Sequence, residues 1–397
     1  MARTLVLAVA AGCGPPEAPG PPVEAIPAWS PVAVVPAGAF TSPRHRVEDL
    51  AAGPGGTLHA VFTDTRGPVS RWNRVLYARF DGRAWSPPEP VDDTPGRSHA
   101  PRVAVDGAGR AHVFWWEGMN TARPGHGTHL LHRARGGEGW SAPDTVYREP
   151  APSGLMDLQL AAVADAAGRV HVVHSRAEGR LGYAVREGEA WRAGAQAPAG
   201  GGYLRWDRPA ARAGRLELAY VAAQVSEARR SANNDLWTLA QGADGWRAPA
   251  PVHLAPTQTL DPAVVTDGQG VRHAVWTERT ARGRVERLLH STSRDGVRWE
   301  VPRDVVPPSP DADFYAPRLE LDAQGRVNLL FLRSTAASVV PFHARGDGRG
   351  GWSTPRRVAP DEPSGRLDLE LAADAGGTLH ALWRGVDGLY RHARLPG

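Results

Sequence analysis

Three arginines stand at one place in a repeating pattern and could bind a common anion. Arg102, Arg208 and Arg318 each open a predicted strand in alternate repeats of the chain. If these innermost strands converge on an axis, the three guanidinium groups face one another across it. A guanidinium binds a carboxylate through two parallel hydrogen bonds, which suits an acidic sugar. The alternative is that each arginine pairs with a neighbouring Asp or Glu in the channel, and the sequence leaves both open.

Three aromatic residues, Tyr203, Trp206 and Trp72, lie in long loops that do not repeat. Binding residues concentrate in such loops, and exposed aromatic rings can stack on sugar rings. These residues are therefore candidates for binding a glycan. The alternative is that they fill the channel or pad the seam between two repeats.

Five histidines occupy one repeat position and could suggest a metal site; they are His59, His112, His171, His273 and His380. A metal site needs ligands that converge within a few ångströms, whereas equivalent positions in successive repeats point to equivalent places on a ring. Glu217 and Asn328 stand at the same position in other repeats. We therefore expect packing histidines that hydrogen-bond their neighbours, with no metal and no cofactor.

The element that must position these residues is a repeat marked by tryptophan. Trp recurs before a short strand, usually followed by a small residue and Pro, at spacings between 51 and 56 residues. The seven copies begin at Trp29, Trp85, Trp140, Trp191, Trp246, Trp299 and Trp352. A period near fifty residues indicates a repeat architecture.

One repeat contains four short alternating segments, 101–106, 111–116, 129–134 and 140–146, separated by turns rich in glycine. Four antiparallel strands per repeat are typical of a β-propeller blade. The last repeat stops after its third strand, and a spare fourth strand lies at 28–36. The sequence thus predicts an all-β, seven-bladed propeller of four-stranded antiparallel blades. The N-terminal strand would close the last blade.

The N-terminus has the features of an export signal. Residues 1–13 combine an early arginine, an apolar run and small residues before Cys13, the single cysteine; they resemble the lipobox of bacterial lipoproteins. The alternative is an ordinary signal peptide cut nearby. Residues 14–27 form a Pro- and Gly-rich linker, and 28–397 would be one propeller domain. We expect an exported monomer, either on the cell envelope with a lipid on Cys13 as its only membrane contact or secreted.

Charge argues against a nucleic-acid partner. The net charge is only +4 and acidic residues interleave with the basic ones. All 46 basic residues are arginine in a chain rich in Ala, Gly and Pro, so the basic character reflects codon composition.

The segment 293–299, Ser-Arg-Asp-Gly-Val-Arg-Trp, resembles the Asp-box turn of the sialidase-like, or BNR-repeat, propellers, although the usual box has one more residue between Asp and Gly. Sialidases of that family use an arginine triad, a Tyr–Glu nucleophile pair and an Asp acid. By residue type, the resemblance makes Tyr315, Glu117 and Asp313 candidate catalytic residues. That family has six blades, so arginines in alternate blades of seven would not form its triad.

These observations favour a non-catalytic module that recognises a glycan or another cell-surface ligand. One alternative is a glycan-cleaving enzyme, either a sialidase-like hydrolase or a polysaccharide lyase. The other is a scaffold for assembly of envelope proteins. The fold alone does not separate these functions, because propellers host many of them.

Overall fold

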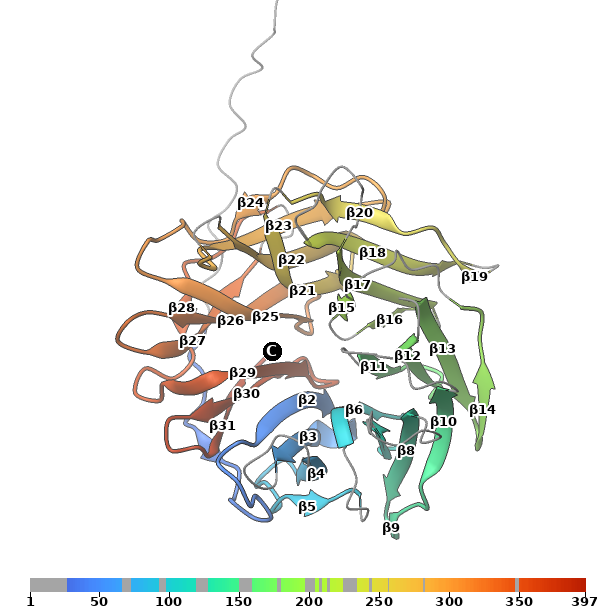
Figure 1. Cartoon of the computed structure of the whole chain (residues 1–397). Coiled ribbons are helices and arrows are strands. Elements are labelled where there is room, and N and C mark those ends of the chain that lie inside the picture. The colour runs from blue at the N-terminus through green and yellow to red at the C-terminus, as the bar shows by residue number, and fades with distance from the viewer. Residues whose placement is uncertain are drawn as a thin grey trace, which may run out of the picture.

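The computed structural model describes residues 27–65, 73–92, 98–118, 128–149, 159–176, 180–196, 204–206, 209–212, 215–223, 234–242, 245–255, 257–280, 283–346 and 350–397. These residues form a ring of antiparallel sheets around a central opening (Figure 1). The described part holds one short helical turn, η1 (Pro54–Gly56), and no helix in it is long and apolar enough to cross a membrane.

The described strands form six hydrogen-bonded sheets. The first contains β2 (Arg46–Ala52), β3 (Leu58–Thr65), β4 (Asn73–Phe80) and β5 (Glu89–Pro90). The second contains β6 (Ser98–Val105), β7 (Ala111–Glu117), β8 (Thr128–Gly136), β9 (Gly139–Trp140) and β10 (Asp144–Glu149). The third contains β11 (Leu160–Ala164), β12 (Val170–Arg176), β13 (Arg180–Glu187) and β14 (Ala190–Ala193).

The fourth sheet contains β15 (Leu204–Trp206), β16 (Ala210–Arg212), β17 (Arg215–Ala223), β18 (Asn234–Gly242), β19 (Gly245–Trp246) and β20 (Ala250–His253). The fifth contains β21 (Gln258–Thr266), β22 (Arg272–Arg279), β23 (Arg287–Ser293) and β24 (Arg303–Asp304). The sixth contains β25 (Asp313–Leu321), β26 (Val327–Ser334), β27 (Val339–Arg345), β28 (Arg356–Arg357), β29 (Ser364–Ala373), β30 (Leu379–Gly385), β31 (Tyr390–Leu395) and β1 (Ala33–Val34).

The all-β propeller is present, but the prediction of seven separate four-stranded blades is wrong. Five sheets in the described residues are separate blades, and they hold four, five or six strands. The sixth is one continuous eight-stranded sheet, because Val339 of β27 pairs with Ser364 of β29 and so joins two strand groups. The tryptophan period counts sequence repeats, whereas a sheet is defined by which backbone groups meet, and a single ladder pair merged two repeats here.

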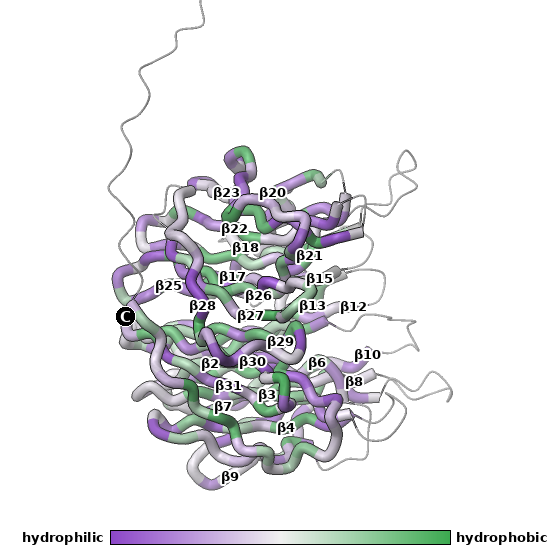
Figure 2. The backbone as a smooth tube through the Cα atoms, turned by 90° about the vertical axis from the view of Figure 1, so that its left-hand side faces the viewer, coloured by the Kyte–Doolittle hydropathy of each residue, from purple (hydrophilic) through white to green (hydrophobic). Residues whose placement is uncertain are grey.

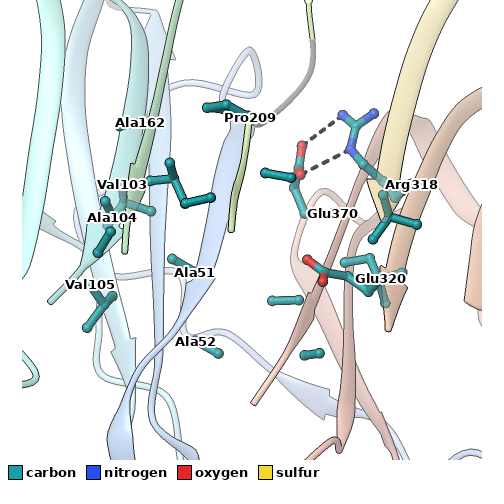
Figure 3. A pocket seen from close by; sticks show the side chains of 18 of the residues that line it. Ala51, Ala52, Val103, Ala104, Val105, Ala162, Pro209, Arg318, Glu320 and Glu370 are labelled. Atoms are coloured by element: carbon teal, nitrogen blue, oxygen red, sulfur yellow. Dashed lines mark hydrogen bonds and ion pairs between the residues drawn. The ribbon is translucent and has the colours of Figure 1, made fainter. Parts of the chain in front are cut away.

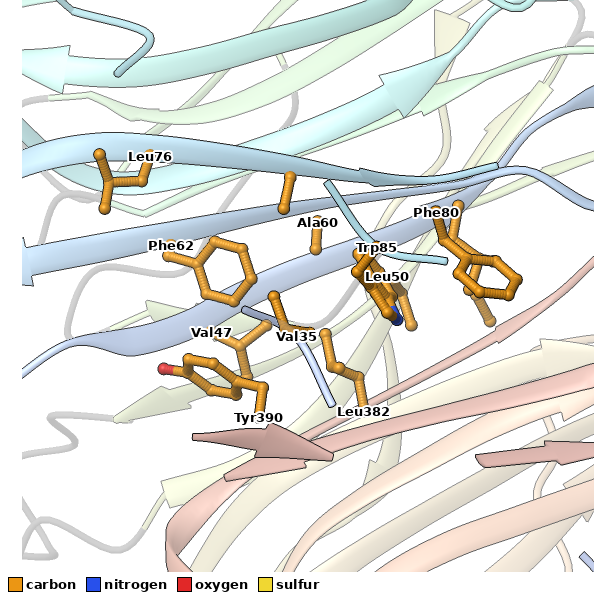
Figure 4. Close-up of a cluster of buried hydrophobic side chains, with 13 residues drawn as sticks. Val35, Val47, Leu50, Ala60, Phe62, Leu76, Phe80, Trp85, Leu382 and Tyr390 are labelled. Carbon is orange, nitrogen blue, oxygen red and sulfur yellow. The ribbon is translucent and has the colours of Figure 1, made fainter. Parts of the chain in front are cut away.

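The N-terminal strand does pair with the last strand of the chain. In β1, Ala33 and Val34 lie opposite His392 and Arg391 of β31, and the Val35 N–H donates to the Tyr390 carbonyl. Val35 is fully buried in a cluster that also contains Phe62 and Leu382 (Figure 4). Strand pairing and side-chain packing therefore join the two ends of the chain and cover the edge of β31.

The two rims of the ring differ in how the strands are joined. Figure 2 shows the ring from the side, with one rim at each side of the view. We call lower face the rim with the turns between the first and second strands of a sheet and between the third and fourth. We call upper face the opposite rim, where strands such as β7 end at Glu117 and β8 begins at Thr128. In the lower turn at Asp106, the carboxylate accepts the N–H groups of Ala108 and Arg110 at 3.0 and 2.9 Å, and Gly109 takes the positive φ of 77° that the turn requires.

The repeated histidines follow these turns and are structural. The second oxygen of Asp106 lies 3.2 Å from His112 Nε2, and His112 Nδ1 lies 3.0 Å from Nε2 of His132 on the third strand. The other members of the set make the same strand-three contact, to Tyr77, Tyr183, His290 and His392. The prediction that these histidines hydrogen-bond their neighbours is confirmed.

The tryptophan of the repeated phrase packs across the seam between neighbouring strand groups. Trp191, at the outer edge of the β11–β14 sheet, meets His132 of the preceding sheet edge-on at 5.2 Å between ring centroids. The same contact joins Trp140 to Tyr77, Trp246 to Tyr183, Trp352 to His290, Trp29 to His343 and Trp85 to His392. Edge-to-face aromatic packing adds about 1 kcal/mol per pair beyond burial. The phrase is thus a packing element and not a binding site.

Candidate functional site

The central channel is narrow and mostly apolar. Its cavity of about 270 Å³ is lined by innermost strands from every sheet, chiefly through alanines and valines. The charged groups that line it are Arg318, Glu320 and Glu370 (Figure 3). A ligand pocket for a drug-sized molecule has roughly 300–1,000 Å³. The volume of the channel lies just below this range.

The described arginines of the predicted triad are paired with carboxylates. Arg318 donates to both oxygens of Glu370 at 3.1 and 3.0 Å, in the two-bond geometry expected for a strong pair. Arg102 donates to the Glu48 carbonyl at 3.1 Å and lies 3.9 Å from its carboxylate. Arg208 lies outside the described residues. The pairing alternative thus describes both arginines that can be seen, and their role in ligand binding stays a prediction.

A row of polar side chains crosses the upper end of the β6–β10 sheet. Ser98 of β6 lies opposite Glu117 of β7, Glu117 lies opposite His129 of β8, and His129 lies opposite Arg148 of β10. Directly paired residues of antiparallel strands place their side chains on the same face of the sheet. We call these four residues the upper row. Hydroxyl, carboxylate, imidazole and guanidinium groups therefore stand side by side at one rim of the ring.

Asp92 extends this row from the neighbouring sheet. Its carboxyl group accepts the Ser98 hydroxyl at 2.5 Å and the Val75 N–H at 3.0 Å, and its side chain is buried. Burial raises the pKa of Asp92 to about 6, and the negative charge of Glu117 acts in the same direction. Close to neutral pH this carboxyl group can therefore hold a proton, which an ordinary surface aspartate cannot.

Glu117 brings an unused acceptor to the row. Its Oε2 atom is buried and has no hydrogen-bond partner in the described part of the chain. His129 is the next residue of the upper row. Burial and the charge of Arg148 lower the pKa of His129, whereas the charge of Glu117 opposes this shift. Asp92 and Glu117 are thus two neighbouring carboxyl groups, and the charge of Glu117 favours the protonated form of Asp92.

A backbone kink lies near the start of β6, next to the upper row. Ala100 has a φ of 50° immediately before Pro101, and the β6–β7 register shifts between His99 and Arg102. Alanine rarely takes this conformation, so the surrounding contacts must hold it. The same kink occurs at Ala316 before Pro317 and at Asp261 before Pro262. It is a shared device of the first strands and does not by itself mark the site.

The opposite face of the same sheet end carries a cluster that the sequence did not reveal. The Tyr147 hydroxyl lies 3.1 Å from Glu149 Oε2, and Arg176 Nε donates to the same hydroxyl at 3.1 Å. The Arg176 guanidinium also lies over the Tyr147 ring, 4.9 Å from its centroid. Burial raises the pKa of Tyr147, and the Glu149 charge adds to the shift. The signal was present as two residues at i and i+2 on one strand, which share a face.

The other predicted site residues lie elsewhere or outside the description. Tyr315 and Asp313 are both on β25, in a different sheet from Glu117. Asp313 accepts the Val285 N–H at 2.9 Å and Arg284 Nε at 3.3 Å, and burial raises the pKa of Tyr315. Tyr203, Trp72 and Cys13 lie outside the described residues, and of Trp206 only the backbone, in β15, is described. Their roles stay predictions.

Metal coordination receives no support from the visible side chains. Across the described ranges, no group of three or more His, Cys, Asp or Glu side chains is arranged to hold a metal ion.

Known structures share the architecture. A polysaccharide lyase described as an ulvan lyase superposes with a TM-score of 0.60 at 12% identity, covering 92% of this chain and 94% of that one. A protein of unknown function from Dyadobacter fermentans gives 0.55 at 14% identity, covering 92% and 98%. The intramolecular trans-sialidase from Ruminococcus gnavus gives 0.49 at 12% identity, covering 90% and 96%.

The chain has a β-propeller fold. At such low identities the likenesses to the ulvan lyase and to the Dyadobacter fermentans protein show the fold alone. No protein-family model matches the sequence, and no curated protein matches it either.

Proposed function

We propose that this propeller is a glycan-recognition module of the cell envelope that holds a sugar at the upper end of the β6–β10 sheet. The observation that carries the proposal is the upper row beside Asp92. There Glu117 presents an unpartnered buried oxygen next to a histidine and an exposed arginine. Sugar hydroxyls need such acceptors, and Arg148 suits a carboxylate or sulfate on the sugar. The ulvan lyase of the same fold is a glycan-active propeller, which fits the proposal.

Replacing Glu117 with Gln tests the binding site. The change keeps the shape of the side chain but puts a donor in place of an acceptor, so we expect glycan affinity to fall about tenfold or more. The measurement is a glycan array followed by titration of the best ligand. The matched control is Glu278→Gln, because Glu278 holds the corresponding position between Thr259 and Arg287. Equal affinity of Glu117→Gln and the parent chain would reject this site.

Glycan cleavage is the second candidate, and the Asp92–Glu117 pair is the observation that favours it. Two neighbouring carboxyl groups can act as general acid and general base on a glycosidic bond. A panel of chromogenic glycosides, together with an assay for unsaturated lyase products, separates the two functions. Turnover that Asp92→Asn abolishes would establish an enzyme, whereas binding without turnover supports recognition.

Membrane attachment through Cys13 completes the proposal. We expect Cys13→Ser to release the protein from the membrane fraction of its host, because the lipid would be lost with the thiol. Immunoblots of washed membranes and of soluble fractions measure this. Persistence of the variant in the membrane fraction would count against a lipid at this position.

A further inference from the structure

The lower face carries a basic turn whose charges the ring does not use. Arg294, Arg298 and Arg303 are exposed and line an open pocket of about 410 Å³ between β23 and β24. Their guanidinium groups have no hydrogen-bond or ion-pair partner among the residues that the structure describes. Other arginines of the same face, such as Arg110 and Arg326, are bound by their own turn aspartates at 2.8 and 2.7 Å. These three are therefore available to an outside partner.

The acidic groups beside this turn do not cancel it equally. Asp295 is held by the turn itself: its carboxylate accepts the N–H groups of Val297 and Arg298, each at 2.8 Å, and the Ser293 hydroxyl at 3.2 Å. Glu300 is the other carboxylate that lines the pocket, and it is exposed. Three free guanidinium groups thus face one free carboxylate, which leaves a positive surface.

Apolar side chains stand out of the same turn. Val297 is 61% exposed and Val301 is 80% exposed, which places both among the few large hydrophobic side chains left in solvent in the described part of the ring. Cations beside protruding apolar side chains are the composition of surfaces that rest on a lipid interface. A soluble anion would satisfy the arginines but would give the valines nothing to contact.

The chain enters the ring on this same face. The Ser30 N–H donates to the Arg394 carbonyl near the lower end of β31, and β1 runs from there toward the upper face. Trp29 packs on His343 of β27, and Gly350, in the turn that follows β27, lines the pocket with Arg303. The segment that precedes residue 27 therefore joins the ring close to the basic turn.

From these observations we propose that the lower face docks on an anionic lipid surface through Arg294, Arg298, Arg303, Val297 and Val301. The ring would then lie with its lower face against the membrane and present the upper row outward. This docking is a contact of the folded ring and does not depend on a lipid at Cys13 or on glycan binding.

Vesicle co-sedimentation tests the proposal on the full chain carrying Cys13→Ser, so that no covalent lipid contributes. We expect binding to vesicles of phosphatidylcholine with phosphatidylglycerol, weakened by salt, and little binding to phosphatidylcholine alone. An arginine near an anionic surface contributes about fivefold in affinity, so a triple Arg→Gln change at positions 294, 298 and 303 should weaken binding about a hundredfold. Val297→Ser with Val301→Ser should weaken it further.

The control is the same charge change on the upper face, at the exposed residues Arg44, Arg279 and Arg366. Equal losses in the two triple variants, or equal binding to neutral and anionic vesicles, would overturn the proposal. Binding to a soluble anionic polysaccharide such as heparin, without binding to vesicles, would overturn it as well, because the basic turn would then be a polyanion site. Melting curves of each variant verify that the ring is folded.

Discussion

Deleting residues 28–36 is expected to destabilise the ring by on the order of 5 kcal/mol. The deletion removes the buried Val35 and the half-buried Trp29, and it leaves β31 with an open edge. Urea denaturation followed by tryptophan fluorescence measures the loss. Two single substitutions in this segment show whether the destabilisation comes from the buried packing of the strand or only from the removal of nine residues. Val35→Ala should cost about 2 kcal/mol, whereas Val34→Ala, at a side chain 45% exposed, should cost almost nothing.

An unchanged unfolding midpoint after the deletion would mean that β1 contributes nothing to the ring. Equal effects of Val34→Ala and Val35→Ala would mean that the side chains of this strand do not seal the seam with the β2–β5 sheet. Both results are incompatible with the packing in Figure 4.

Acid is expected to unfold this protein at a pH where most carboxylates are still charged. Burial lowers the pKa of His132 to about 2 and the pKa values of His290, His343 and His392 to about 3. In the unfolded chain the same groups titrate near 6.5. The folded state therefore binds fewer protons below that pH, so this stability is complete above pH 6.5 and is lost as the pH falls.

The size of this effect follows from proton linkage. Each such histidine costs about 2 kcal/mol between pH 7 and pH 5, and four together cost about 8 kcal/mol. The whole stability of a protein is typically about 5–15 kcal/mol. Asp92 and Asp368 act in the opposite direction, because burial raises the pKa of each carboxyl group and so penalises the folded state at neutral pH, but they are fewer than the buried histidines. We therefore expect a steep fall in urea midpoint between pH 6.5 and pH 5.

The chain itself offers the control for this prediction. Tyr77 and Tyr183 take the strand-three position in two sheets and hydrogen-bond His59 and His171 at 2.6 and 2.8 Å. In His132→Tyr and His290→Tyr, the new tyrosine can make the same hydrogen bond to the strand-two histidine. It adds no group that becomes charged in acid. Each change should remove the contribution of one buried histidine, about 2 kcal/mol between pH 7 and pH 5, and the two together about 4 kcal/mol. An acid midpoint unaffected by both changes would show that the buried histidines do not control acid unfolding.

The sequence was sufficient for the fold class and for the joining of the chain ends, because both depend on local patterns that repeat. Alternation, glycine turns and the spare Trp29 segment predicted the strands and the pairing of β1 with β31. The number of separate blades could not be derived in the same way. It depends on the pairing of Val339 with Ser364. This pairing joins two repeats, and the sequence pattern within a repeat does not encode it.

The candidate site was only partly predictable for a related reason. Glu117 was named for its residue type, but its neighbours come from strands across the ladder, and Asp92, which binds Ser98 beside it, comes from a different sheet. Asp92 gave no signal, since its raised pKa arises from burial that exists only in the folded ring. The arginines were visible as a pattern, and yet Glu370, which neutralises Arg318, lies 52 residues further along the chain.

The tryptophan that crosses each seam has a consequence for how such rings change in evolution. Trp140 contacts Tyr77 next door and Trp191 contacts His132 next door, so every contact of this kind is with an adjacent strand group. A duplicated unit would bring its own tryptophan and its own strand-three partner, and a lost unit would remove both. The number of units in the ring can therefore change during evolution without a new kind of interface between units. The packing around the central channel is then the part that must adapt to the new number.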